Sequence, residues 1–202
     1  MFNLIRKDIA LQKNTLIIMI PLLLIYLSLG SSSIFVGVLF CMAIIMQSFS
    51  MDEKSSIHLL LNSLPYTRKE IVSSKYMSAG VFTFLVVLTI FLGNLLIHRE
   101  IIQWEPLLMI ISMVALFISL AFPFSYLFKS QYLMFVLGAL FVLYIVVVNT
   151  FIPNFNDRVR EGMIMVLSSE NSLLYVGILL AVGCLYILSW MFSIRIYSRK
   201  VF

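Results

Sequence analysis

Long apolar stretches separated by short polar segments run through the whole chain. A helix needs about 20 mostly apolar residues to cross the hydrocarbon core of a bilayer. On that criterion the pattern predicts six membrane-spanning helices, at residues 15–29, 34–50, 76–97, 106–128, 132–152 and 173–194. The first two are short and are joined by the turn Gly30-Ser31-Ser32-Ser33, which is typical of a tilted hairpin. The pattern therefore predicts an all-α membrane protein with a single transmembrane domain over residues 1–202.

Basic residues are distributed unevenly between the two sides of this arrangement. With a cytoplasmic amino terminus, 11 of the 14 lysines and arginines fall in cytoplasmic segments, and 3 fall in outer segments (Arg99, Arg158 and Arg160). Lysine and arginine concentrate in the cytoplasmic loops of membrane proteins, and this bias sets the orientation. We therefore expect both termini to be cytoplasmic.

The segments outside the spans are short, and each has an expected place. Residues 1–13 carry apolar side chains on one helical face, with basic side chains and Gln12 largely elsewhere, which predicts an interfacial helix. Helical spacing of apolar residues also predicts a short helix in the outer loop. The resulting plan is 1–13 (interfacial helix), 15–50 (first two spans), 51–75 (cytoplasmic segment), 76–152 (next three spans), 153–172 (outer loop), 173–194 (sixth span) and 195–202 (cytoplasmic tail).

The composition supports a membrane protein and excludes several other classes. Hydrophobic residues make up 62% of the chain and charged residues 11%, whereas soluble domains carry about 25% charged residues. Cys41 and Cys184 lie inside apolar stretches and are expected to be packing residues. His58 and His98 fall on opposite sides of the membrane, and no Ser–His–Asp or His-Glu-x-x-His arrangement is present. We therefore expect no catalytic residue, metal site or cofactor on this chain, and no nucleic acid partner.

Polar residues and glycines are scattered within the predicted spans. The expected role of the polar side chains is hydrogen bonding between helices, and that of the glycines is close helix packing. The polar set is Gln47, Ser48, Thr83, Asn94, Ser112, Ser119, Ser125 and Asn149, and the glycine set is Gly80, Gly93, Gly138, Gly177 and Gly183. No charged residue lies at the centre of a predicted span, which argues against an ion-coupled transporter.

Residues 51–75 carry the most informative pattern in the chain. Four apolar residues fall at i, i+3, i+4 and i+7, which predicts a helix with a narrow apolar stripe. These residues are Ile57, Leu60, Leu61 and Leu64. Asp52 and Glu53 precede the stripe, where acidic side chains stabilise a helix amino terminus. We call residues 52–64 the docking segment, because such a helix is suited to a groove on a soluble partner; the alternative is a helix that rests on the lipid headgroups.

The docking segment is followed by signals for a new helix. Pro65 ends the first helix, because its ring cannot continue the hydrogen-bond pattern. Thr67 is suited to cap the next helix, with Glu70 three residues later completing a capping box. Basic residues follow at the expected cytoplasmic edge of the membrane, where anionic headgroups stabilise them. They are Arg68, Lys69 and Lys75.

The motif in this region resembles permease subunits of the ABC-2 superfamily. The matching residues are Glu53 and the run Ser63-Leu64-Pro65-x-x-Arg68-Lys69-x-Ile71-Val72-x-x-Lys75-Tyr76, set within the six-span frame. The resemblance is nearest to a small branch found in Firmicutes, which includes the permeases of the staphylococcal phenol-soluble modulin exporter. It covers the whole chain in topology, but the sixth span and the outer loop show no match at the level of motifs.

This resemblance implies an ABC-2, or type V exporter-like, fold of six spans with an amino-terminal interfacial helix and a cytoplasmic coupling helix. It implies a bacterial plasma-membrane permease that pairs with a second copy or a sister permease and with ABC ATPase subunits. No G-x-x-x-x-G-K-[ST] run is present in this chain, so ATP and magnesium are expected on the ATPase partner. The implied cargo is an amphipathic, membrane-active peptide, such as a phenol-soluble modulin or an antimicrobial peptide. The alternative function is a non-transporting scaffold or sensor that recruits a cytoplasmic partner.

Overall fold

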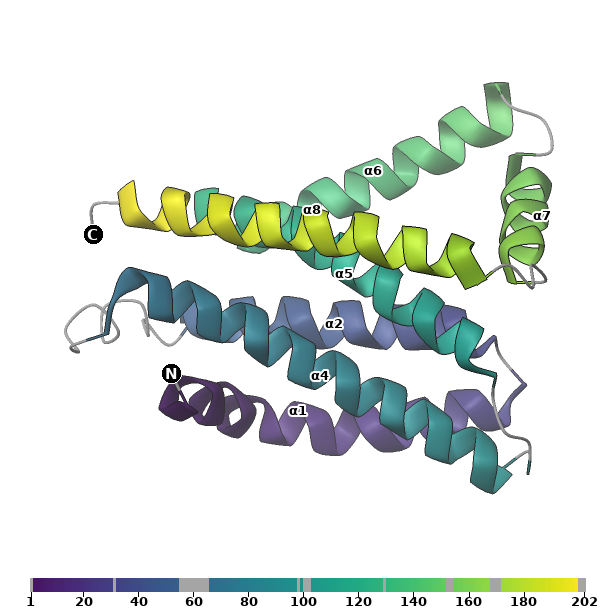
Figure 1. Ribbon diagram of the computed structural model, residues 1–202, viewed down its shortest axis with the longest axis horizontal. Helices are drawn as coiled ribbons and strands as arrows, with labels where there is room; N and C mark the ends of the chain where they lie inside the picture. The colour runs from purple at the N-terminus through teal and green to yellow at the C-terminus, as the bar shows by residue number, and fades with distance from the viewer. Residues whose placement is uncertain are drawn as a thin grey trace.

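The described part of the chain is helical throughout. The computed structural model describes residues 2–30, 32–54, 66–97, 99, 103–128, 130–151, 155–167 and 172–199. The helices in these ranges are α1 (Phe2–Ser28), α2 (Ser33–Lys54), α4 (Arg68–Ile97), α5 (Trp104–Leu127), α6 (Ser130–Phe151), α7 (Phe155–Leu167) and α8 (Ser172–Arg199). Most of them run roughly side by side along the long axis of the molecule (Figure 1).

Five of these helices are long and apolar enough to cross a membrane, judged by length and composition. They are α1, α2, α4, α5 and α8. The prediction of an all-helical, multi-pass membrane protein is therefore confirmed. The 22-residue helix α6 occupies the place of the predicted fifth span but is not one of the five, so the count of six spans stays a prediction.

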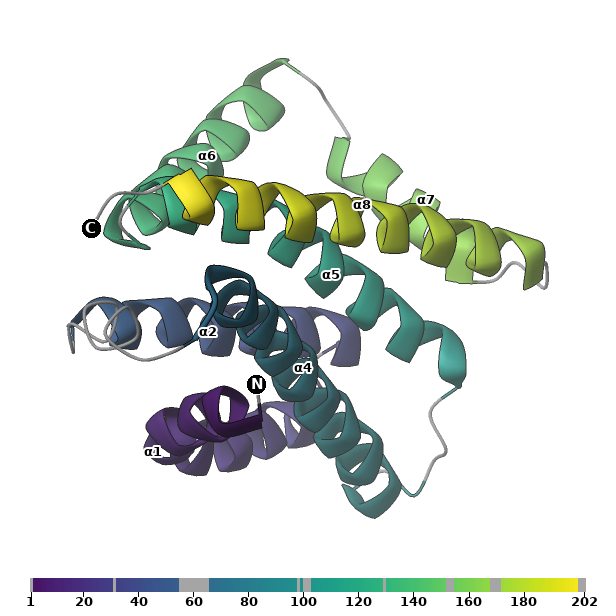
Figure 2. The ribbon, with the colours of Figure 1, turned by 60° about the vertical axis from the view of Figure 1, so that its left-hand side comes forward.

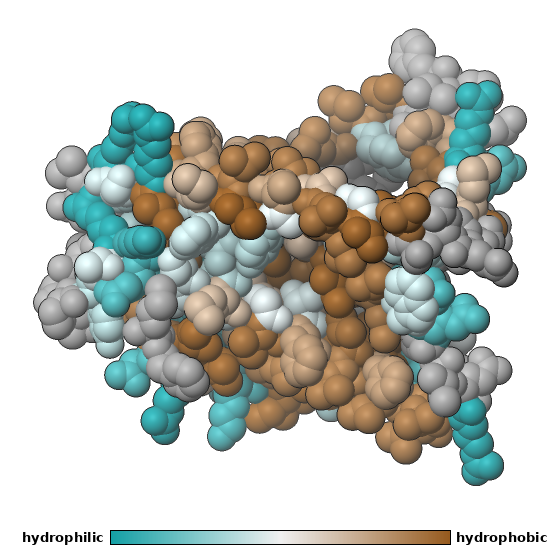
Figure 3. Space-filling view, in the orientation of Figure 1, coloured by the Kyte–Doolittle hydropathy of each residue, from teal (hydrophilic) through white to brown (hydrophobic). Residues whose placement is uncertain are grey.

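The surface follows the same plan. In Figure 3 apolar residues cover the middle of the molecule, and the hydrophilic residues gather toward the two ends of the long axis. A bundle in this arrangement presents its apolar middle to lipid and its polar ends to water.

Helix α1 differs from the expected arrangement. The sequence predicts an interfacial helix over residues 1–13 and a separate span from residue 15, but the structure has one continuous helix from Phe2 to Ser28. Its inward row consists of Leu4, Asp8, Gln12 and Leu16, all buried. Asp8 and Gln12 therefore share the face of the buried leucines, which is a different row from the apolar face predicted from Phe2, Ile5 and Ile9.

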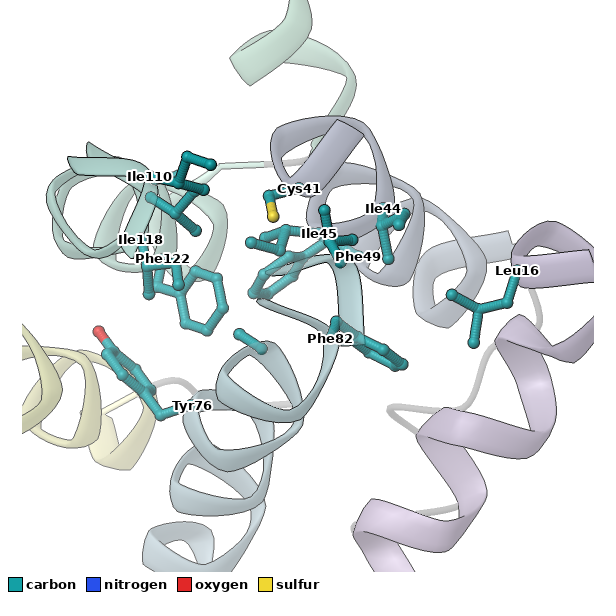
Figure 4. Packing of buried hydrophobic residues seen from close by; sticks show 14 of the residues in the cluster. Leu16, Cys41, Ile44, Ile45, Phe49, Tyr76, Phe82, Ile110, Ile118 and Phe122 are labelled. Atoms are coloured by element: carbon teal, nitrogen blue, oxygen red, sulfur yellow. The ribbon is translucent and has the colours of Figure 1, made fainter. Parts of the chain in front are cut away.

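The core lies where α2, α4 and α5 meet (Figure 4). Phe49 of α2 packs edge-on against Phe122 of α5, with 4.8 Å between ring centroids. Phe82 of α4 and Ile45 of α2 are almost completely buried in the same cluster. Cys41 is also fully buried among them, so its expected packing role is confirmed.

Two glycines shape the first helical hairpin. Gly30 has a φ of 75° and lies in the turn between α1 and α2, in a backbone conformation that glycine adopts without strain. Gly37 faces Ile90 of α4 and Ile110 of α5, and a Cβ there would lie 2.7 Å and 2.9 Å from their Cδ1 atoms. The close approach of α2 to both neighbours therefore depends on the absence of a side chain at position 37.

The predicted packing glycines behave differently from one another. At Gly93 an added Cβ would meet Leu24 and Leu27 at 3.0 and 3.1 Å, which is the expected close contact. At Gly80, Gly138, Gly177 and Gly183 an added Cβ would meet no atom of the described residues within 4 Å. The close-packing prediction is confirmed for Gly93, whereas the other four glycines make no such contact within the described part of this chain.

Helices α6 and α7 lie at the edge of the bundle, where α6 contacts α2 and α5. In Figures 1 and 2 α6 leans away from α8, and α7 lies across the far end between α6 and α8. α7 (Phe155–Leu167) is the short helix predicted in the outer loop, and its presence is confirmed. Its place at the outer membrane surface stays a prediction.

Candidate functional site

Four charged side chains from three helices meet at one end of the bundle. We call Lys7 and Asp8 of α1, Asp52 of α2 and Lys75 of α4 the ion cluster. Asp8 and Asp52 are each 1% exposed and Lys75 is 6% exposed. The two acidic and two basic groups have no net charge together, so the desolvation cost of each ion is offset by its partners.

Lys75 is the centre of the ion cluster. Its ammonium group has three hydrogens to donate, and the structure provides three acceptors. Nζ lies 3.0 Å from Asp8 Oδ1 and 3.0 Å from Ser48 Oγ, and it also forms an ion pair with Asp52 Oδ2. The same nitrogen lies 5.8 Å from the centroid of the Phe49 ring. Lys75 is thus fully satisfied, and its removal would leave two buried carboxylates with only Lys7 beside them.

The amino-terminal helix contributes the other half of the cluster. Lys7 Nζ lies 3.1 Å from Asp8 Oδ1 and 3.4 Å from Asp52 Oδ1, so it bridges α1 and α2. Ser78 of α4 donates a hydrogen bond of 2.8 Å to Asp8 Oδ2. One turn further along α1, the side chain of Gln12 donates a hydrogen bond of 3.0 Å to the Ile44 carbonyl, which is a second contact between α1 and α2.

The length of the helices explains why charges are tolerated here. α4 has 30 residues, about 45 Å at 1.5 Å per residue, which exceeds the roughly 30 Å of the hydrocarbon core. Lys75 lies two turns from the start of α4, and Asp52 lies in the last turn of α2. The ion cluster therefore belongs to the ends of the helices and not to the middle of the membrane.

The opposite face of α4 is tied to α8 and α5. The hydroxyl of Tyr76 lies 2.7 Å from Ser189 Oγ and 2.8 Å from Ser193 Oγ of α8. Ser189 Oγ in turn donates to the Ser119 carbonyl of α5 at 2.7 Å, and Tyr186 donates to the Tyr76 carbonyl at 2.9 Å. Because Lys75 and Tyr76 are adjacent, one turn of α4 joins the α1–α2 pair on one side to α5 and α8 on the other.

The start of α4 is also fixed. The carboxylate of Glu70 accepts hydrogen bonds from the Thr67 backbone N–H (2.9 Å) and hydroxyl (2.8 Å), and Thr67 Oγ1 accepts from the Glu70 N–H at 3.2 Å. The predicted capping box is confirmed. Arg68 donates to the carbonyls of Tyr197 (3.3 Å) and Ser198 (2.7 Å) at the end of α8. These carbonyls lack partners within their own helix, so Arg68 connects the start of α4 to the end of α8.

Some of the predicted site residues lie in described helices, and the others lie outside the described ranges. Asp52 and Glu53 end α2 and do not begin a new helix, which corrects the predicted helix start. A negative charge at a helix carboxyl end is unfavourable, and the ion pairs of Asp52 with Lys75 and Lys7 compensate for it. Lys69 lies 6.0 Å from the Trp190 ring of α8, and Lys75 is buried in the ion cluster, not at the lipid edge. The residues outside the described ranges are Ile57, Leu60, Leu61, Leu64 and Pro65.

Sequence reasoning missed Asp8, Ser48 and Ser78 as parts of one site. The usable signal was the row Leu4, Asp8, Gln12 and Leu16, which repeats every four residues and places a charge on an apolar face. A lone carboxylate on such a face requires a buried partner. Ser48 was expected to bond between helices, and its contact with Lys75 confirms that role. By contrast, Thr83, Ser112 and Ser119 donate to carbonyls of their own helices.

An apolar groove is the second feature of the described bundle. It has a volume of about 440 Å³ and lies between α4, α5 and α8. Small residues open it, namely Gly80, Ala115 and Gly183, and its few polar atoms come from side chains such as Thr83 and Ser112. Two of the four predicted packing glycines that have open space beside them, Gly80 and Gly183, therefore border this groove. Within the described ranges no group of three His, Cys, Asp or Glu side chains could hold a metal ion.

Comparison with known proteins identifies the family. The family model described as ABC-2 family transporter protein matches residues 3–198, which is nearly the whole chain of 202 residues. No curated protein and no solved structure matches the chain. Permeases of this family lack a nucleotide-binding domain and work with separate ABC ATPase subunits. The match reaches from α1 to α8, and the chain therefore belongs to the ABC-2 family of transporter membrane proteins.

Proposed function

We propose that this chain is the permease subunit of an ATP-driven exporter in a bacterial plasma membrane, with both termini in the cytoplasm. A separate ATPase binds the apolar stripe of the docking segment, which consists of Ile57, Leu60, Leu61 and Leu64. The observation that supports this proposal most directly is the ion cluster, because it joins α2, which precedes the docking segment, to α4, which follows it. Asp52 of α2 and Lys75 of α4 stand on the two sides of residues 55–65 and pair directly.

This connection supports a mechanism for transmitting force. A push on the docking segment reaches α2 and α4 together, because their ends are held by a buried ion pair. Asp8 extends the unit to α1, and Tyr76 extends it to α8. A charge-assisted contact between well-satisfied groups is stiff and directional. ATP-driven movement of the partner would then tilt several helices at once, as alternating access requires.

The cargo that fits these features is an amphipathic, membrane-active peptide, such as a phenol-soluble modulin or an antimicrobial peptide. The groove between α4, α5 and α8 is almost wholly apolar, and the charged groups of the ion cluster lie at the helix ends. An apolar groove wall favours a peptide that has an apolar face. Two copies of the permease, or this chain with a sister permease, would enclose the path.

Disrupting the docking segment tests the proposed partner. Leu60→Asp and Leu64→Asp each place a charge on the apolar stripe and are expected to abolish co-purification of the ATPase encoded in the neighbouring reading frame. Membrane insertion should be unchanged. The matched control is Val159→Asp on α7, an exposed position, which should leave ATPase binding intact. Full co-purification and normal export by both leucine variants would refute the docking assignment.

The alternative is a non-transporting scaffold or sensor that uses the same segment to recruit a cytoplasmic partner. Reconstitution of the chain with its ATPase in liposomes separates the two functions. The exporter hypothesis predicts that amphipathic helical peptides stimulate ATP hydrolysis. An unchanged rate across a series of such peptides favours the scaffold.

A further inference from the structure

We propose that a groove between the carboxyl-terminal ends of α5 and α8 binds one anionic phospholipid. The groove has a volume of about 530 Å³ and is separate from the groove between α4, α5 and α8. Its lining residues are Tyr126, Leu127, Phe192, Arg195, Ile196 and Arg199. This assignment does not depend on the ATPase or on the transported cargo.

Two arginines provide the charge for this ligand. Arg195 and Arg199 are four residues apart on α8, so they occupy the same face one turn apart. Among the described residues, no acidic side chain lines the groove and neither arginine forms an ion pair with a carboxylate. The guanidinium group keeps its charge at all physiological pH values, and its fork of N–H donors matches the oxygens of a phosphate. The pair is therefore suited to a phosphodiester.

Another contact leaves these arginines available. Arg68 of α4 already donates to the carbonyls of Tyr197 and Ser198 at the end of α8. The last turn of α8 thus has a cationic partner from a different helix. Arg195 and Arg199 remain exposed and line the groove.

The apolar wall of the groove selects a lipid over a soluble phosphate. Phe192 and Leu127 are 56% and 52% exposed, and both border the same groove as the arginines. Behind them Tyr126 is buried, with its ring 5.5 Å from that of Tyr197. Phosphate-binding arginines beside open apolar side chains match a molecule with an anionic head and acyl chains. A phosphate ion or a free nucleotide would leave that wall in contact with water.

The test is competitive lipid binding to the full chain in neutral detergent, read by native mass spectrometry with equal amounts of phosphatidylglycerol and phosphatidylcholine. Wild-type protein should retain phosphatidylglycerol preferentially. Combining Arg195→Gln with Arg199→Gln should weaken its binding about 25-fold, or about fivefold per arginine, the size expected for basic groups at an anionic surface. The control combines Arg6→Gln with Lys13→Gln, which removes two exposed charges from α1 and should leave binding unchanged.

Several outcomes would overturn the proposal. The first is that the control variant weakens phosphatidylglycerol binding as much as the arginine pair does, which would indicate diffuse electrostatic attraction. The second is that the wild-type protein shows no preference for phosphatidylglycerol. The third is that equimolar inorganic phosphate or glycerophosphoglycerol displaces the lipid. If the glutamine pair does not fold, Arg195→Lys with Arg199→Lys is measured in its place. This pair keeps the charge and loses the forked donors, so it should bind phosphatidylglycerol several-fold more weakly; affinity equal to wild type would contradict the assigned role.

Discussion

At the scale of single residues, Lys75 is a buried lysine whose charge is balanced by two buried carboxylates. It donates to two carboxylates and one hydroxyl inside the bundle, so each neighbour depends on its charge. The sequence motif marked Lys75 and Tyr76 as a pair but placed the lysine at the lipid edge. Neither its burial nor its partners could be predicted, because Asp8 and Asp52 are 67 and 23 positions away in the chain and only packing brings them together.

The first prediction concerns the stability of the ion cluster. Lys75→Met leaves Asp8 and Asp52 buried with Lys7 alone and should lower the free energy of unfolding by about 3–5 kcal/mol. Reversible unfolding in mixed micelles of sodium dodecyl sulfate measures this loss. The control is Lys13→Met, at an exposed position of α1, which should change stability by less than about 0.5 kcal/mol.

A second substitution separates loss of charge from loss of packing. Adding Asp52→Asn to Lys75→Met removes one uncompensated carboxylate, and Asp8 still pairs with Lys7. The double variant should recover about 2 kcal/mol of the loss. If Lys75→Met unfolds like Lys13→Met, or if Asp52→Asn gives no recovery, the ion cluster does not hold the three helices together.

At the scale of helices, the sequence predicted the elements better than their limits. The apolar stretches located α2, α4, α5 and α8, and Thr67 with Glu70 located the start of α4. The predicted helix boundaries were wrong where charged residues continue a helix, as at Asp8 in α1 and Asp52 in α2. Buried partners stabilise these charges, and hydropathy does not register that stabilisation. Four of the five predicted packing glycines make no close helix contact within the described part of the chain. The positions of glycines in a sequence do not distinguish a helix contact from an open groove.

The groove between α4, α5 and α8 leads to the next prediction. Gly183→Phe places a ring where an added Cβ meets no atom within 4 Å, so it should fill part of the groove without displacing a helix. Export of an amphipathic peptide by the reconstituted complex should fall at least tenfold, while ATPase binding is kept. A tenfold change corresponds to about 1.4 kcal/mol.

The matched control lies on the same helix. Gly177→Phe makes the same change at an exposed position of α8 that also has open space and does not line the groove. Its export rate should stay within about twofold of wild type, because the small cost of replacing a helical glycine is shared by both variants. Equal rates for the two variants would exclude the groove as part of the path.

At the scale of the whole molecule, α4 connects the two halves of the bundle. Lys75 binds α1 and α2, and the adjacent Tyr76 binds α8, about two turns from the start of α4, the end that follows the docking segment. The ABC-2 family model matches residues 3–198, so all of these contacts lie within the part of the chain that the family model covers. Under the proposed function, an ATPase bound at the docking segment would act on α1, α2, α4 and α8 through these contacts.

The proposed function requires the docking segment to lie on the cytoplasmic side of the membrane and to be covered by the ATPase. Leu60→Cys, in a chain with the exposed Cys184 replaced by serine, can be labelled with a membrane-impermeant maleimide. We predict no labelling in intact cells, labelling in inside-out vesicles, and protection of the thiol when the ATPase is co-expressed. Arg158→Cys on α7 serves as the control for the outer side and should be labelled in intact cells. Labelling of position 60 in intact cells, or labelling in vesicles that the ATPase does not reduce, would contradict the account.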